Sequence, residues 1–173
     1  MKKIVLKVLE DTLLKYGWTI EKLPSNSSGS LYCFEGKILT FDEKKQMEED
    51  EKQKNLELKS IKSIDFQINI GQKRVYLMHK YTKSVGGAQD NQCNDIRTFL
   101  THAIKNDNKD QIFVSLLDGE YYILKNKKGL SKLDELNQSC IESQKENVFA
   151  TPTENLLFRL EKLIEPWFSK TRA

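Results

Sequence analysis

The sequence has few of the residues that build disulfide frameworks or zinc sites. Its three cysteines, Cys33, Cys93 and Cys140, are odd in number and far apart, and only two histidines occur in the chain. No two cysteines form a CxxC pair. These counts argue against a disulfide framework and against a structural zinc site. We therefore expect a cytoplasmic protein with reduced thiols.

Long hydrophobic runs are also absent. Hydrophobic residues make up 38% of the chain and charged residues 31%. No stretch approaches the roughly 18 consecutive apolar residues that a membrane helix needs. The first residues, MKKIVLK, start like a signal peptide, but Lys7, Glu10 and Asp11 interrupt the apolar run. We expect a soluble protein with no membrane partner.

Neither sign of charge is in strong excess. The 28 Lys and Arg residues against 25 Asp and Glu residues give a formal net charge of +3. This charge permits a nucleic-acid partner but does not indicate one. The length of 173 residues corresponds to one domain that can bury a real core. We expect a single domain over residues 1–173 with its core at about 60–163.

The hydrophobic pattern predicts helices that alternate with strands. Helices are expected at residues 3–16, 88–105, 130–143 and 153–163, and the charged stretch 42–59 is expected to be a solvated helix or a mobile excursion. Strands are expected at 31–34, 37–41, 111–117, 120–124 and 147–151. This order predicts an α/β fold with helices around one mixed sheet.

The most informative segment is 63–80, where apolar residues alternate on both sides of a glycine turn, as in a β-hairpin. A two-residue loop at Gly71-Gln72 would pair the apolar residues of the two strands, Ile68 with Val75 and Phe66 with Leu77. A register shifted by one residue would break this apolar match. The pattern therefore predicts both the hairpin and its register.

The same register gathers other side chains on the opposite face of the hairpin, with Asp65 across from Met78 and Lys80 diagonal to Asp65. A carboxylate there could hold Mg²⁺, and a lysine could orient a water molecule or offset charge on a phosphate. Such a pair suits metal-assisted hydrolysis of phosphodiesters. Alternatively, Asp65 only ends the lysine-rich stretch and Lys80 is an ordinary lysine at a strand end.

Together with the segment KSVGGAQDNQ at 83–92, these residues resemble the core of the PD-(D/E)XK nuclease superfamily, in particular type II restriction endonucleases. The resemblance covers roughly residues 60–125, and less clearly 147–163. It implies a restriction-endonuclease-like three-layer sandwich, with a central mixed β-sheet between helices. It also implies Mg²⁺-dependent cleavage of double-stranded DNA, with Asp65 as a metal ligand and Asp65 and Lys80 as catalytic residues.

One position departs from the pattern of that superfamily. The acid of its acid-x-Lys element falls on Met78, and a thioether is a poor ligand for Mg²⁺. Three explanations remain open. A carboxylate from elsewhere replaces the acid, from Glu10 in the first helix or from Asp90 or Asp95 in the following one; His79 contributes to catalysis; or the site is inactive. His79 could instead be a buried structural histidine.

Amide side chains at the start of a helix can reach base edges or phosphates. We therefore expect four residues of the 83–92 segment to contact DNA, namely Lys83, Gln89, Asn91 and Gln92. A single active site hydrolyses one strand at a time, and the chain has no helix-turn-helix or zinc module to read a groove. We expect a homodimer on a palindromic site or a cleavage subunit directed by a larger recognition subunit. If the site is inactive, we expect a DNA-binding or subunit-interaction module.

Overall fold

The computed structural model describes residues 1–55, 60–83 and 89–171, with side chains described as far as residue 164. Its main feature is a five-stranded sheet with the order β1-β5-β6-β7-β8. The strands are β1 (Thr19–Lys22), β5 (Phe66–Ile70), β6 (Lys73–Tyr81), β7 (Gln111–Asp118) and β8 (Val148–Thr151). Antiparallel pairing joins β1, β5 and β6, and parallel pairing joins β6, β7 and β8. The sheet is therefore mixed.

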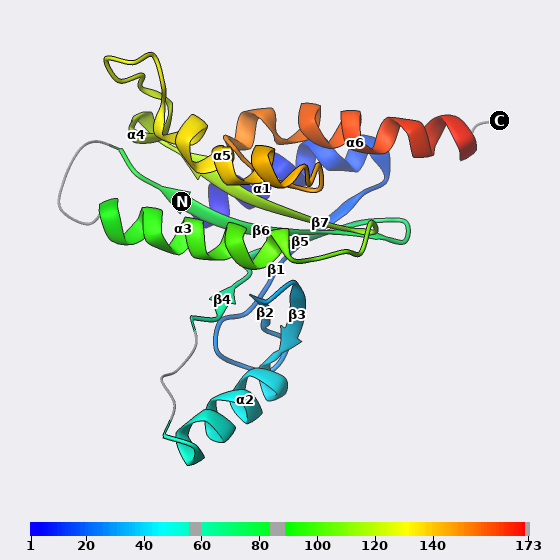
Figure 1. Cartoon of the computed structure of the whole chain (residues 1–173). Coiled ribbons are helices and arrows are strands. Elements are labelled where there is room, and N and C mark those ends of the chain that lie inside the picture. Colours follow the sequence, from blue (N-terminus) through cyan, green and yellow to red (C-terminus); the bar gives the residue numbers. More distant parts are fainter. Residues whose placement is uncertain (56–59, 84–88, 172–173) are drawn as a thin grey trace.

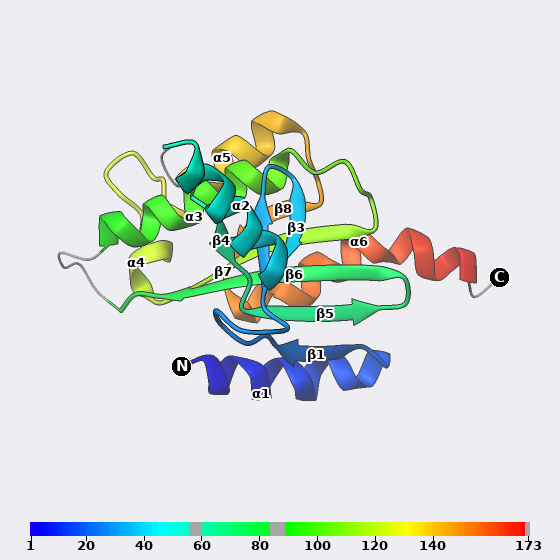
Figure 2. The same cartoon turned by 90° about the horizontal axis from the view of Figure 1, so that it is seen from below.

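Helices cover both faces of this sheet (Figure 1). One face packs against α1 (Lys2–Leu13) and α6 (Leu156–Thr171), which follow the pattern of apolar residues that the sequence predicts. The other face packs against α3 (Gln89–Ile104), α4 (Glu120–Ile123) and α5 (Lys132–Ser143). Figure 2 shows the strands side by side, with α1 beside β1. The chain is thus an α/β protein with a mixed central sheet between two helical layers.

The β5–β6 hairpin has the predicted register. Phe66 pairs with Leu77 and Ile68 pairs with Val75. Gly71 has φ 58°, in the left-handed region that a tight two-residue turn between strands requires. The opposite face of the hairpin is covered over part of its length, because Met78 and its neighbour Tyr76 are buried against α3.

The prediction of one mixed sheet is wrong in part, because the predicted strands at 31–34 and 37–41 belong to a second, three-stranded sheet. This sheet has the order β3-β2-β4 and lies against the end of α3 (Figure 1). It contains β2 (Leu31–Phe34), β3 (Lys37–Thr40) and β4 (Lys62–Ser63), and α2 (Phe41–Gln53) packs on it. A Cβ on Gly36 would lie 2.5 Å from the carbonyl oxygen of Lys105, so this close approach requires glycine. His102 of α3 binds the carbonyl of Ser60 at 2.8 Å and accepts a hydrogen bond from the backbone N–H of Glu35.

The charged stretch at 42–59 is helical as far as Gln53, which agrees with the first of its two predicted states, a solvated helix. Residues 56–59 lie outside the described residues. Three short elements differ from the sequence prediction. The strands β1 and β4 were not predicted. The predicted strand at 120–124 is wrong, because these residues form the short helix α4. The other predicted helices and strands are confirmed within a few residues, except that α6 continues to Thr171, beyond its predicted end at Leu163.

The free edge of β8 is closed by a side chain instead of a further strand. The amide of Asn137, from α5, donates to the carbonyl of Ala150 at 2.9 Å and accepts from its N–H at 2.8 Å. These are the two hydrogen bonds that a neighbouring strand would make with one residue. Pro152 follows the strand and has no N–H to offer. The outer edge of β8 is therefore capped at Ala150.

Candidate functional site at one edge of the sheet

The candidate residues meet where three parallel strands end. His79 and Lys80 lie near the carboxyl end of β6, and Asp118 ends β7. Because β5 runs antiparallel to β6, Asp65 at its amino end reaches the same edge. We call this edge, with Asp65, His79, Lys80 and Asp118, the carboxyl edge. Crevices beside the carboxyl ends of parallel strands are the usual ligand sites of open α/β sheets.

Asp65 binds one group from its own sheet and one from a helix. Its Oδ2 accepts a hydrogen bond from the backbone N–H of His79 at 2.8 Å. Its Oδ1 forms an ion pair with the Nζ of Lys2, in the first turn of α1. Only 15% of the Asp65 side chain is exposed. The carboxylate thus satisfies the strand N–H of β6 just where β5 begins.

Lys80 pairs with a carboxylate from α3. Its Nζ lies 3.3 Å from Oδ2 of Asp95, and Lys62 of β4 lies 2.7 Å from Oδ1 of the same group. Burial raises the pKa of Asp95, but the hydrogen bonds and charges of Lys62 and Lys80 outweigh this effect and lower the pKa below its ordinary value. Asp95 is therefore an ionised carboxylate held between two lysines.

His79 is buried, as its place on the hairpin predicts, and its ring belongs to a second hydrogen-bonded group. Its Nε2 lies 2.9 Å from Oδ2 of Asp118. Asp118 also accepts hydrogen bonds from Thr153, at 2.9 Å from the backbone N–H and 2.6 Å from the hydroxyl. His79 therefore links two carboxylates. Its backbone N–H binds Asp65, and its ring binds Asp118 at the end of β7.

The two main candidates point to different layers. Asp65 binds Lys2 of α1, and Lys80 binds Asp95 of α3. Because α1 and α3 cover opposite faces of the sheet, the structure brings Asp65 and Lys80 to one edge but gives them separate partners. Met78, only 4% exposed, lies in the apolar core on the α3 face of the sheet and adds no oxygen donor.

The other predicted metal ligand lies farther away. Glu10 is exposed on α1, eight residues after the lysine that meets Asp65. Eight residues advance a helix by about 12 Å, so the structure does not bring Glu10 to Asp65. Within the described part of the chain, no group of three or more His, Cys, Asp or Glu side chains could hold a metal ion.

The predicted DNA contacts have mixed surroundings. Lys83 and Asn91 are exposed, whereas Gln89 is buried. The side-chain oxygen of Gln92 accepts a hydrogen bond from the hydroxyl of Thr82 and another at 3.2 Å from a tyrosine of α4. Gln89 and Gln92 are therefore engaged inside the protein, and Lys83 and Asn91 face the solvent. Residues 84–88 of the same segment lie outside the described residues.

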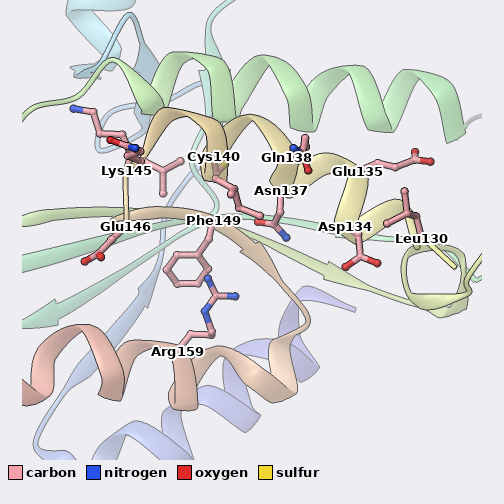
Figure 3. A pocket seen from close by; sticks show the side chains of 13 residues that line it. Leu130, Asp134, Glu135, Asn137, Gln138, Cys140, Lys145, Glu146, Phe149 and Arg159 are labelled. Carbon is pink, nitrogen blue, oxygen red and sulfur yellow. The ribbon is translucent and has the colours of Figure 1, made fainter. Parts of the chain in front are cut away.

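A cavity of about 1060 Å³ lies away from the carboxyl-edge residues, between α5, β8 and α6 (Figure 3). Its walls include Asn137, Cys140 and Phe149, and the guanidinium of Arg159 lies 4.2 Å from the centre of the Phe149 ring. Burial raises the pKa of the Cys140 thiol to about 11, so this cysteine is a poor nucleophile. Neither Asp65 nor Lys80 lines this cavity.

Sequence reasoning missed four residues of the carboxyl-edge network: Lys2, Lys62, Asp118 and Thr153. Three of them, Lys2, Lys62 and Thr153, reach a carboxylate from an element distant in sequence, so no local spacing indicates them. Asp118 did carry a signal, because an acid at the end of a buried strand lies where ligand sites form. No protein-family model, curated protein or solved structure matches this chain. In the described residues, no helix is long and apolar enough to cross a membrane.

Proposed function

We propose that this chain is a Mg²⁺-dependent DNA endonuclease of the type II restriction kind, or the cleavage subunit of a two-subunit enzyme, with a restriction-endonuclease-like fold. The observation that supports this proposal most is the contact between Lys80 and Asp95. Asp95 is one of the acids that could replace the carboxylate missing at Met78. It is ionised and lies beside the lysine of the acid-x-Lys position.

The donor chemistry fits the proposed metal. Asp65 and Asp95 offer carboxylate oxygens, the ligands that Mg²⁺ prefers, although their partners Lys2 and Lys80 lie toward opposite faces of the sheet. Bound Mg²⁺ would polarise a phosphate and lower the pKa of a water molecule. Lys80 would orient the attacking water or offset negative charge on the phosphate, and the backbone N–H of His79 would hold the Asp65 carboxylate in place.

A second candidate function is that of a catalytically inactive nuclease-fold protein that binds DNA or another subunit. Its support is that protein cations already neutralise both carboxylates, with Lys2 on Asp65 and Lys62 and Lys80 on Asp95. A metal ion would have to compete with these ion pairs.

Cleavage of supercoiled plasmid in Mg²⁺ separates the two functions. We expect Asp65→Asn, Asp95→Asn and Lys80→Ala each to lower the nicking rate by about 100-fold or more, the size typical for loss of an electrostatic catalytic group. Asp65→Asn keeps an oxygen that can accept the hydrogen bond from His79. Circular dichroism checks that each variant is folded.

Asp107→Asn is a matched control, because Asp107 also pairs with a lysine, Lys145, at 2.7 Å but lies beyond the other end of α3. It should nick at the parental rate. Parental activity in Asp65→Asn or Lys80→Ala would exclude the proposed site. Absence of nicking in the parent, with no heat of Mg²⁺ binding by calorimetry, would favour the inactive module.

A further inference from the structure

We infer that residues 125–132, here called the lysine loop, form a contact surface for the phosphate backbone of duplex DNA. The inference deepens the proposed function and rests on it for the choice of DNA as partner. The loop has the sequence KNKKGLSK, with four lysines and no acidic residue. It connects α4 to α5.

The loop has a defined backbone. A β-bridge joins Lys125 to Ser131 at its base. The side-chain oxygen of Asn126 accepts hydrogen bonds from the backbone N–H groups of Lys128 at 2.8 Å and Leu130 at 3.1 Å. The backbone N–H of Asn126 donates to the carbonyl of Leu130 at 2.8 Å. The backbone thus holds Lys127 and Lys128 at an exposed tip, so that less ordering of the backbone is needed on binding.

The charges at this tip are not neutralised inside the protein. Within the described residues, neither Lys127 nor Lys128 takes part in an ion pair. Many other lysines do, including Lys2, Lys44, Lys62, Lys73, Lys80, Lys105, Lys132 and Lys145. Two adjacent, exposed and unpaired ammonium groups would attract phosphates and release their counterions.

The lysine loop lies beside the candidate site. The hydroxyl of Tyr122 in α4 contacts the Thr82 hydroxyl at 3.1 Å and the Gln92 oxygen at 3.2 Å, so α4 packs where β6 ends and α3 begins. The loop leaves this helix almost directly, and Figure 1 shows it in yellow above α4. A duplex held by the loop would therefore lie beside the end of β6 and the start of α3.

The position of the apolar residues favours DNA over an anionic membrane. Ile123 and Leu124 are 52% and 62% exposed, but they belong to α4 and its end, at the base of the loop. Leu130 is 47% exposed, but it follows the Lys127–Lys128 tip and lines the cavity between α5 and α6. The tip therefore carries lysines without an apolar side chain that could enter a bilayer, as interfacial anchors require.

Fluorescence anisotropy with a labelled 20-base-pair duplex in EDTA measures binding without cleavage. We expect the double variant Lys127→Gln, Lys128→Gln to bind more weakly than the parent. The slope of log affinity against log salt, between about 50 and 200 mM, should decrease in magnitude by about two, since each phosphate contact contributes about 0.9. The matched control is Lys37→Gln, Lys109→Gln, which removes the same charge from exposed lysines at the opposite end of α3 and β7.

An unchanged slope in the control together with the reduced slope in the loop variant would support the inference. Equal losses in both variants would overturn it, because the effect would then reflect net charge alone. Loop-dependent binding to phosphatidylserine vesicles without duplex binding would also overturn it. Loop-dependent duplex binding by a parent that never nicks DNA would leave this inference standing and refute the endonuclease. If the parent nicks DNA and the loop variant binds the duplex as the parent does, the lysine loop is not the contact surface, and the endonuclease proposal stands.

Discussion

Asp118 connects the carboxyl ends of the three parallel strands through hydrogen bonds. It ends β7, its carboxylate binds the ring of His79 from β6, and it accepts two hydrogen bonds from Thr153 just beyond β8. Burial raises the pKa of this carboxyl, but the hydrogen bonds from His79 and Thr153 outweigh that effect and lower the pKa below its ordinary value.

The lowered pKa of Asp118 predicts a pH-dependent loss of stability in Asp118→Asn. A carboxyl with a lower pKa in the folded state stabilises the fold above its unfolded pKa near 4, and this contribution is lost as the pH falls through the folded value. At pH 7 we expect the variant to lose about 1–3 kcal/mol of unfolding free energy, as for a hydrogen-bonded charged group. The deficit should shrink below about pH 4.

Urea unfolding at a series of pH values measures this difference. Glu154→Gln removes the same charge from an exposed neighbour and should change stability little at any pH. An equal deficit for Asp118→Asn at low and neutral pH would mean that its ionisation does not support the fold.

Gly119 permits a close approach between the ends of β6 and β7. It has φ 106°, and a Cβ at this position would lie 2.0 Å from the carbonyl oxygen of Thr82. Because that neighbour is backbone, it cannot rotate away. We expect Gly119→Ala to lower the unfolding free energy by about 3 kcal/mol or more, measured by thermal or urea unfolding.

Gly17→Ala controls for backbone strain alone. Gly17 also has a positive φ, 70°, but nothing lies within 4 Å of its added Cβ. This variant should lose only about 1 kcal/mol, the cost of a non-glycine residue in the left-handed region. Similar losses in the two variants would show that the contact with Thr82 is unimportant.

The candidate site was predictable only in part at the level of residues. Alternation along the hairpin placed Asp65 opposite Met78, because a strand repeats every two residues. Alternation does not reveal what covers a face, so the burial of Met78 under α3 was missed. The partner of Asp65, Lys2, is 63 positions away, and only the docking of a helix brings the two together.

At the scale of elements, the helix α4 illustrates how propensity fails in short segments. The sequence Tyr121-Tyr122-Ile123 favours a strand, since aromatic and β-branched residues are common in strands. Only Tyr122 is buried, however, and its hydroxyl binds Thr82. One buried anchor is enough to fix a single helical turn. The β5–β6 hairpin was easier to predict because its turn and its alternation are both local.

The side chain that closes the edge of β8 gives a prediction for α5. Asn137→Asp keeps an acceptor for the N–H of Ala150 but replaces the donor with a carboxylate that faces the Ala150 carbonyl. We expect a loss of about 2 kcal/mol in unfolding free energy, because the remaining groups are left unsatisfied or repelled. An exposed strand edge should also increase self-association at high concentration, measured by light scattering.

Gln72→Glu is the matched control, since it makes the same amide-to-acid change on an exposed residue of the β5–β6 turn. It should leave both stability and light scattering near the parental values. Parental stability in Asn137→Asp would show that the edge of β8 does not need its amide.

The whole molecule has a net charge of only +3, and many of its lysines are paired within the fold. Strong unaided binding to a phosphate backbone usually draws on a larger basic surface. We therefore expect that the proposed endonuclease does not cut both strands of a specific site as a lone monomer.

Analytical ultracentrifugation with and without duplex DNA tests this expectation. A dimer would support a palindromic enzyme, whose two-fold axis places a second site on the other strand. A monomer that binds duplex poorly would support a cleavage subunit directed by a larger protein. Site-specific double-strand cleavage by a strictly monomeric chain would contradict both.

The amide that closes β8 also bears on the order in which the molecule is assembled. Asn137 and Ala150 are 13 positions apart, whereas Thr19 of β1 and Asn69 of β5 are 50 positions apart. Closing the shorter loop costs about 1 kcal/mol less chain entropy, and short loops close sooner. During folding, Asn137 can therefore cap the β8 edge before β1 pairs with β5 at the opposite edge. Association between incompletely folded chains should therefore begin at the β5 side of the sheet.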